Sequence, residues 1–133
     1  MDYPEVATIL RIAELAEDWF TVRLFIAMLE KNRGHYFVAV RNNVVLGTIF
    51  SSHDGGYFGY LYKLAVLPQY QREGIGSALL QKVVREFRAI GIDWYFANVD
   101  KVNQASLSLL AKHGIRPQER FLMVDNWEHA SKT

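Results

Sequence analysis

The spacing of hydrophobic residues along this chain changes several times, and each change predicts a different kind of element. Short runs of β-branched and aromatic residues between turn formers predict strands, whereas apolar residues three and four positions apart predict helices with one buried face. The chain is therefore expected to begin with a strand over residues 6–12. A helix then follows from Asp18, which can cap it, to about Asn32.

The middle of the chain predicts three strands joined by short turns. The strands cover residues 36–41, 44–51 and 57–66, with Asn42-Asn43 in the first turn and Asp54-Gly55-Gly56 in the second. Both turns are built from residues that favour tight reversals. This part of the chain is expected to form an antiparallel meander.

The period then becomes helical over residues 75–87, and Gly91 suits the position just after a helix. A strand over residues 92–99 follows, so strand, loop, helix and strand predict a crossover between two parallel strands. Asn103 can cap a short final helix that ends at Gly114, and residues 120–125 predict a last strand. The order is mixed α/β.

Composition limits the class of protein. The chain has 133 residues, half of them hydrophobic, so residues 1–133 are expected to form a single domain with a real core. Fifteen Lys and Arg nearly balance fourteen Asp and Glu, which gives no signal for nucleic acid or an anionic membrane. No stretch is long and apolar enough to span a bilayer.

The absence of cysteine excludes a thiol nucleophile, a thiolate zinc site and an iron–sulfur cluster. No basic region followed by an apolar region opens the sequence, and no disulfide can form. The expected compartment is the cytoplasm, and no metal site is expected.

The stretch QREGIG, residues 71–76, lies between the third meander strand and the long helix. A loop at such a junction directs unpaired backbone N–H groups into one space, and the helix dipole adds positive potential. Glycines at 74 and 76 let a ligand's oxygens approach those N–H groups, as a phosphate requires. A tight turn that needs glycine only for packing is the alternative, and the two glycines alone do not decide between them.

Two familiar nucleotide loops do not fit this stretch. A P-loop requires a lysine directly after its second glycine, whereas Ser77 follows Gly76. The dinucleotide fingerprint requires glycine or alanine where Leu79 stands, at the head of a repeating βαβ series that is missing. Nucleoside triphosphate hydrolysis and a Rossmann site are therefore disfavoured.

A known family does match the loop together with its surroundings. The stretch LAVLPQYQREGIGSALL, residues 64–80, resembles the acyl-CoA-binding segment of the GNAT superfamily of N-acyltransferases. The family pattern Gln/Arg-x-x-Gly-x-Gly/Ala is matched by Gln71, Gly74 and Gly76. The stretch NQASLSLLAKHGI, residues 103–115, is similar to the second signature, an Asn-led helix that ends in Gly-Phe. The resemblance covers residues 57–115 well.

The resemblance implies an α/β (α+β) fold. Its sheet is twisted, mixed and mainly antiparallel, is flanked by helices, and has a parallel strand pair that splays apart at the cofactor cleft. The implied activity is an N-acetyltransferase that moves an acetyl group from acetyl-CoA, a co-substrate, to a primary amine by direct attack. The implied acceptor is a small molecule or a peptide, and a homodimer is a candidate assembly.

On the same analogy, the backbone of Leu64 and Val66 pairs with the pantetheine amides, and the backbone N–H of Val66 is a candidate to polarise the thioester oxygen. Asn103 contacts the cofactor from the other side or is a plain helix cap, and both roles stay open. The pyrophosphate would be held by Gln71, Arg72, Glu73, Gly74, Ile75 and Gly76.

The sequence departs from the family pattern at the catalytic acid. In many members a tyrosine seven residues after the signature asparagine protonates the departing thiolate, and this chain has Leu110 there. Ser106 and Ser108 are nearby hydroxyls, although serine on a short helix is more often solvated. The meander strand 57–66 lacks a carboxylate, and for each nearby base candidate a turn or surface role is the simpler interpretation. These candidates are His53, Asp54, Asp93 and Asp100.

Because Leu110 replaces the family tyrosine, a second function remains an alternative, namely a catalytically weak domain that binds acyl-CoA as a sensor or regulator. A third is a small α/β interaction domain that binds no nucleotide. The aromatic residues Tyr57, Phe58, Tyr60 and Tyr62 line an acceptor cleft or simply follow from strand propensity. Strict alternation places Lys63 on a solvated face, with Tyr62 and Leu64 pointing the other way.

Overall fold

The structure is a computed structural model that describes residues 4–5 and 36–126. The strand predicted over residues 6–12 and the helix predicted over residues 18–32 lie outside these residues. The described elements are β1 (Tyr36–Arg41), β2 (Val44–His53), β3 (Phe58–Val66), the 3-10 turn η1 (Pro68–Tyr70), α3 (Ile75–Ala89), β4 (Trp94–Ala97) and α4 (Gln104–Lys112).

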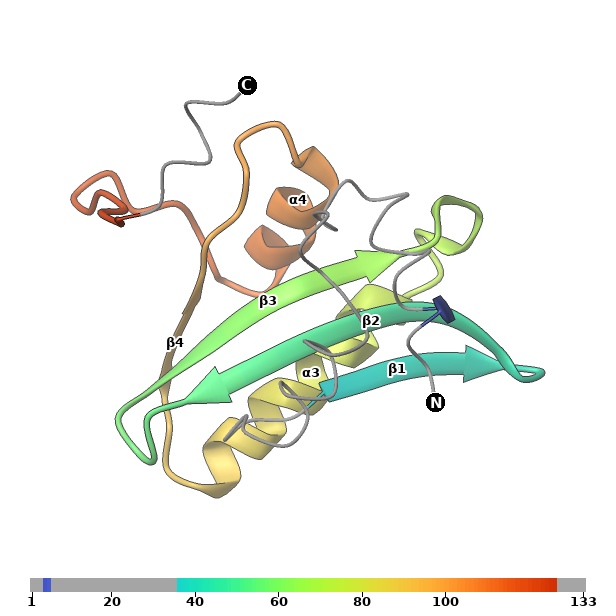
Figure 1. The fold of residues 1–133 in the computed structure, drawn as a ribbon, viewed down its shortest axis with the longest axis horizontal. Coiled ribbons are helices and arrows are strands. Elements are labelled where there is room, and N and C mark those ends of the chain that lie inside the picture. Colours follow the sequence, from blue (N-terminus) through green and yellow to red (C-terminus); the bar gives the residue numbers. More distant parts are fainter. Residues whose placement is uncertain (1–3, 6–35, 127–133) are drawn as a thin grey trace.

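The strands form one sheet in the order β1-β2-β3-β4 (Figure 1). β1 and β3 both pair antiparallel with β2, whereas β3 and β4 pair in parallel across the α3 crossover. Asn42 and Asn43 have φ angles of 52° and 64°, as the two central positions of a type I′ hairpin require. The predicted fold class, a mainly antiparallel mixed sheet with one parallel pair and flanking helices, is confirmed.

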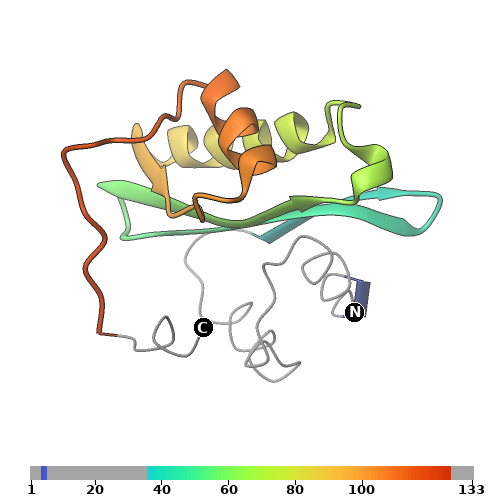
Figure 2. The same ribbon diagram turned by 90° about the horizontal axis from the view of Figure 1, so that it is seen from above.

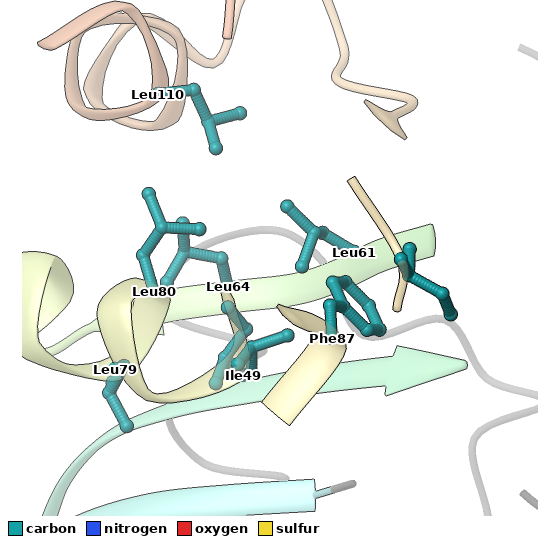
Figure 3. Packing of buried hydrophobic residues seen from close by; sticks show 9 residues of the cluster. Ile49, Leu61, Leu64, Leu79, Leu80, Phe87 and Leu110 are labelled. Carbon is teal, nitrogen blue, oxygen red and sulfur yellow. The ribbon is translucent and has the colours of Figure 1, made fainter. Parts of the chain in front are cut away.

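The helices α3 and α4 lie on the same side of the sheet (Figure 2). The apolar face of α3 that the spacing predicted is buried at Leu79, Leu80, Val83 and Phe87. It packs with residues from β2, β3 and α4 into one hydrophobic core (Figure 3). The other members of this core are Ile49, Leu61, Leu64, Ile92 and Leu110. This core holds α3 and α4 against the same face of the sheet, next to the C-terminal part of β3.

The ends of both helices follow the glycine signals. After α3, the N–H of Gly91 donates to Arg88 and the N–H of Ile92 donates to Phe87, which is the Schellman arrangement with Gly91 at φ 86°. Ile92 was predicted to begin a strand, but it belongs to this cap, so β4 begins only at Trp94. Gly114 ends α4 in the same way, as predicted.

A β-bulge interrupts β3. Thr48 pairs with Ala65 and Phe50 pairs with Tyr62, so one residue of β2 faces both Lys63 and Leu64. Lys63 takes a left-handed φ of 54°. The alternation predicted for this strand is therefore wrong beyond Tyr62: Leu64 lies in the core beside α3, whereas Tyr62 contacts Phe50 on the opposite face.

The strand predicted over residues 120–125 is also wrong. Residues 121–125 have no regular secondary structure, and residues 119–120 form a turn. Four consecutive apolar side chains are exposed there, at 60% for Phe121, 87% for Leu122, 68% for Met123 and 89% for Val124. A strand needs a neighbouring strand to pair with, and the apolar character of this run does not supply one.

Candidate active site

The parallel ladder between β3 and β4 is shorter than β3. It ends at the pair Leu61 and Ala97, whereas β3 continues to Val66. Along this remainder, the carbonyl oxygen of Leu64 accepts a hydrogen bond from the Ser106 hydroxyl at 3.5 Å, and that of Val66 accepts one from Gln71 Nε2 at 3.0 Å. The N–H and C=O of one strand residue point the same way, so the N–H groups of Leu64 and Val66 face this edge.

The glycine loop joins this edge to the start of α3. Gly74 is the N-cap residue of α3, with φ 83°, and no side chain caps the helix. The first N–H groups of a helix have no partner within the helix, so the N-terminus of α3 offers several donors and positive potential. Arg72 also has a left-handed φ, 71°, a conformation that non-glycine residues adopt at an energetic cost of about 1–3 kcal/mol.

The two glycines of the loop are required for different reasons. A Cβ added at Gly74 would meet no atom within 4 Å, so the backbone conformation alone demands glycine there. A Cβ added at Gly76 would lie 2.5 Å from Cδ2 of Leu109, because α4 packs against the first turn of α3. Packing therefore explains Gly76, but it does not explain Gly74.

The helix α4 forms the opposite wall. Asn103 is its N-cap residue, and its side chain accepts a hydrogen bond from the N–H of Ser106 at 3.2 Å. The imidazole Nε2 of His113 lies 3.0 Å from the Ser77 hydroxyl and ties the end of α4 to the start of α3. Leu110, at the position of the family tyrosine, is 4% exposed and lies in the core.

The open edge of β3, the glycine loop and the helix α4 together surround a cleft of about 570 Å³. Among the sequence-predicted cofactor residues, those that line it are Leu64, Val66, Gln71, Arg72, Gly74, Gly76 and Asn103. Glu73 and Ile75 do not line it. Glu73 pairs with Arg41 at 3.2 Å on an exposed surface, and Ile75 packs against the hydrophobic core. These two residues contribute to the loop through their backbone.

Two further lining residues, Ser106 and Ser108, were named from sequence only as nearby hydroxyls. Sequence reasoning did not single out the rest, which are Ala65, Ser77, Gln104, Ala105, Leu109 and Lys112. Positions 104, 108 and 112 are four apart, and so are 105 and 109, which places them on one face of a helix. With Asn103 as the N-cap, this spacing predicts that these side chains share the face of the helix that lines the cleft.

Two of the four base candidates belong to the β2–β3 turn. His53 pairs with Gly59, and Val66 lies seven positions further along β3, a distance of about 23 Å. The Nδ1 of His53 accepts a hydrogen bond from the N–H of Gly55 at 3.0 Å. Oδ1 of Asp54 accepts from the N–H of Tyr57 at 2.8 Å and from two further N–H groups in the turn. The Tyr57 bond, supported by the other two, lowers the pKa of this carboxyl against a smaller opposing effect of desolvation.

The remaining two candidates lie in loops. Asp93 directly precedes β4, whose first residue Trp94 pairs with Phe58 at the end of β3 away from the cleft. Oδ1 of Asp100 accepts a hydrogen bond from the N–H of Val102 at 3.0 Å in the turn before α4. Neither carboxylate lines the cleft.

Within residues 4–5 and 36–126, His, Asp and Glu side chains form no cluster of three that could hold a metal ion. In the same part of the chain, no helix has the length and apolar character that crossing a membrane requires.

Comparison with known proteins gives a consistent family. A family model described as Acetyltransferase (GNAT) family matches residues 4–115. Acetyltransferase SG1711 of Sodalis glossinidius (strain morsitans) is 28% identical over 127 residues, which cover 92% of this chain and 87% of the relative. An N-alpha-acetyltransferase of Sulfurisphaera tokodaii is 26% identical over 125 residues, which cover 84% of this chain and 75% of the relative.

A solved structure shows the same fold. AAC(6′)-Iy, in complex with the bisubstrate analog CoA-S-monomethyl-acetylneamine, superposes with a TM-score of 0.74 at 16% identity, over 95% of this chain and 92% of that one. The family match includes the meander, the glycine loop and the helix that Asn103 caps. The chain therefore belongs to the acetyltransferase (GNAT) family and is an enzyme that transfers acyl groups.

Proposed function

We propose that this enzyme transfers an acetyl group from acetyl-CoA to a primary amine by direct attack of the amine on the thioester. Acetyltransferases of this family use acetyl-CoA. The strongest support from the chain itself is the cleft of about 570 Å³, where an open strand edge and a helix N-terminus meet. An open edge suits the amides of a pantetheine arm, and a helix N-terminus suits a pyrophosphate.

The cofactor residues are assigned by the groups they direct into the cleft. The backbone of Leu64 and Val66 pairs with the pantetheine amides, since both residues present N–H and C=O groups to this edge. The pyrophosphate lies on the N–H groups of residues 71–76, with the Arg72 side chain at the cleft wall. Asn103 both caps α4 and lines the cleft, so the two roles kept open for it are compatible.

The bond changes balance without a covalent enzyme intermediate. The amine nitrogen attacks the carbonyl carbon, the C–N bond forms, and the C–S bond breaks with its electron pair on sulfur. The amine loses one proton, and the thiolate gains one to become free CoA. The backbone N–H of Val66 stabilises the negative charge that develops on the carbonyl oxygen, and the cleft supplies proximity.

The proton on sulfur needs a donor other than residue 110. Leu110 is buried in the core, so we assign this role to solvent or to a hydroxyl of the cleft wall. Ser106 and Ser108 are the α4 hydroxyls in that wall. If either serine supplies the proton, its replacement by alanine lowers kcat while the Kd of acetyl-CoA stays constant.

The test combines binding with turnover. Calorimetry measures binding of acetyl-CoA, and free CoA is followed in the presence and absence of primary amines. Acceptor-dependent CoA release supports the proposal. Binding without release from any amine indicates the acyl-CoA sensor instead, and lack of acetyl-CoA binding rejects both readings in favour of an interaction domain.

A further inference from the structure

An unbroken series of aromatic rings crosses the sheet on the face opposite α3. Gly59 and Leu61 point toward α3, so their neighbours on β3 point away from it. On β4, Tyr95 stacks on Phe87 of α3, so Trp94 and Phe96 also face away. Successive ring centroids lie 4.9–6.4 Å apart. In spatial order the rings are Tyr36, Phe50, Tyr62, Tyr60, Phe96, Phe58, Trp94 and Tyr57.

The series is buried at one end and exposed at the other. Phe50 is 1% exposed, whereas Phe96 is 38%, Trp94 is 53% and Tyr57 is 67% exposed. Aromatic side chains that only filled a core would not leave this much ring surface in water. The exposed part is therefore a surface of aromatic rings along β3 and β4.

This surface adjoins the cofactor cleft. Tyr60 pairs with Phe96, and the next pair, Leu61 and Ala97, is the last of the parallel ladder. The edge assigned to the pantetheine begins three residues later, at Leu64. The opening between the strands thus has the glycine loop and α4 on one side and the aromatic rings on the other. An amine must reach the thioester from a direction that CoA does not occupy, and the aromatic side is such a direction.

Among the described residues, the strand positions that share this face are apolar or uncharged. The residues of β2 that share this face, and those of β3 from Phe58 to Tyr62, include no Asp, Glu, Lys or Arg. Neither Trp94 nor Phe96 is charged. Carboxylates would favour a polycationic acceptor, and these strand positions have none, whereas ring faces bind apolar groups and attract an ammonium group.

Two of the polar groups near the opening, the hydroxyls of Tyr60 and Tyr62, are neutral. Nδ2 of Asn98 donates a hydrogen bond to the Tyr60 hydroxyl at 3.4 Å. Burial, and secondarily the neighbouring Tyr60, raises the pKa of the Tyr62 hydroxyl, so this phenol stays protonated at neutral pH. A hydroxyl such as that of Tyr60 can orient an amine by a hydrogen bond without adding charge.

We propose that the acceptor binds at the end of this surface beside Tyr60, Tyr62 and Phe96, and that it is a monoamine with an aromatic body. The proposal rests on the proposed acetyl transfer. It assigns the specificity for the acceptor to the ring faces of β3 and β4. A polycationic amino sugar and a peptide N-terminus are the competing acceptor classes.

The test compares acceptors that differ in one feature. Phenethylamine carries a phenyl ring on a two-carbon amine, and ethanolamine carries a hydroxyl on the same two carbons. The kcat/KM for phenethylamine is expected to exceed that for ethanolamine by about 10-fold or more, the discrimination typical of an apolar pocket. It is also expected to exceed the values for kanamycin and for an alanine-led peptide.

Two variants test whether the preference for phenethylamine depends on the aromatic rings of this surface. Phe96→Ala removes the ring beside the opening and is expected to raise the KM of phenethylamine by about 5-fold or more, with the Kd of acetyl-CoA unchanged. Tyr57→Ala is the matched control, since it removes an exposed ring of the same series at the end away from the opening. The KM of this variant for phenethylamine is expected to stay within about 2-fold of the KM of the unaltered enzyme.

A binding measurement keeps the inference separate from the proposed function. Saturation-transfer NMR detects phenethylamine on the folded protein without acetyl transfer, so failure to bind acetyl-CoA would reject the proposed function alone. The inference is rejected if phenethylamine does not bind, if binding is unaffected by Phe96→Ala in a protein with normal circular dichroism, or if ethanolamine, kanamycin or the peptide is used as well as phenethylamine.

Discussion

A negative charge at position 74 tests the assignment of the pyrophosphate to the glycine loop. An added side chain meets no atom within 4 Å of its Cβ, so crowding does not confuse the result. The φ angle of 83° is left-handed, and Asn and Asp tolerate that conformation better than other side chains with a Cβ. Gly74→Asp and Gly74→Asn therefore cost similar conformational energy and differ mainly by one negative charge.

The size of the effect follows from Coulomb's law. A carboxylate on the N-cap residue of α3 would lie roughly 6 Å from a phosphate bound at that helix end. At an effective dielectric constant of about 40, two like unit charges at this distance repel by about 1.4 kcal/mol. A pyrophosphate carries more than one such charge. Gly74→Asp is thus expected to weaken acetyl-CoA about 10- to 100-fold, and Gly74→Asn less than about 3-fold.

Calorimetric titration of acetyl-CoA into the three proteins measures this difference, and circular dichroism confirms that each is folded. Because both charges are near the surface, the penalty is expected to shrink as ionic strength rises and the Debye length falls. Equal affinities for the Asp and Asn variants in low salt would refute the reasoning and place the phosphates elsewhere.

Three further predictions concern stability. Gly59→Ala places a Cβ 2.5 Å from the Phe87 ring and is expected to lower the free energy of unfolding by about 1–3 kcal/mol in urea denaturation. Gly56→Ala is the control: its Cβ has no neighbour within 4 Å, so the free energy of unfolding is expected to change by less than about 0.5 kcal/mol. Equal effects of the two substitutions would contradict the packing of Phe87 against Gly59. Leu80→Ala removes a side chain that is 0% exposed and is expected to cost about 2–5 kcal/mol in the same assay, and a smaller loss would mean that the core relaxes around the cavity. The pKa of Asp54 is lowered in the folded state, so its contribution to stability is present above the unfolded pKa and is lost as pH falls through the folded pKa. Asp54→Asn is therefore expected to reduce the loss of unfolding free energy as the pH is lowered. An unchanged dependence on pH would contradict the hydrogen bonds of Asp54 in the β2–β3 turn.

The features predicted best from sequence are those fixed by local chemistry. The Asn42-Asn43 hairpin, the glycine after α3 and the cap at Asn103 each depend on what a few neighbouring residues can adopt. The parallel pair followed from the length of the crossover that α3 occupies. These signals predicted the order of the elements that surround the cleft.

The features predicted poorly depend on partners distant in sequence. The bulge at Lys63 arises from the pairing of β3 with β2, so alternation within β3 alone put Leu64 on the wrong face. The packing of Leu109 against Gly76 required the position of α4, which no loop motif contains. For the same reason, the position of Ser106 and Ser108 in the cleft wall did not follow from sequence.

The unfinished ladder between β3 and β4 also affects how the protein behaves at high concentration. Backbone groups at an open strand edge are a template on which a strand of another molecule can pair. Here α4 shields part of that edge, through the bond from Ser106 to Leu64, and a bound pantetheine arm would shield more of it. Saturating CoA is therefore expected to protect the enzyme against self-association, because the edge that binds the substrate is also an edge on which another chain can pair.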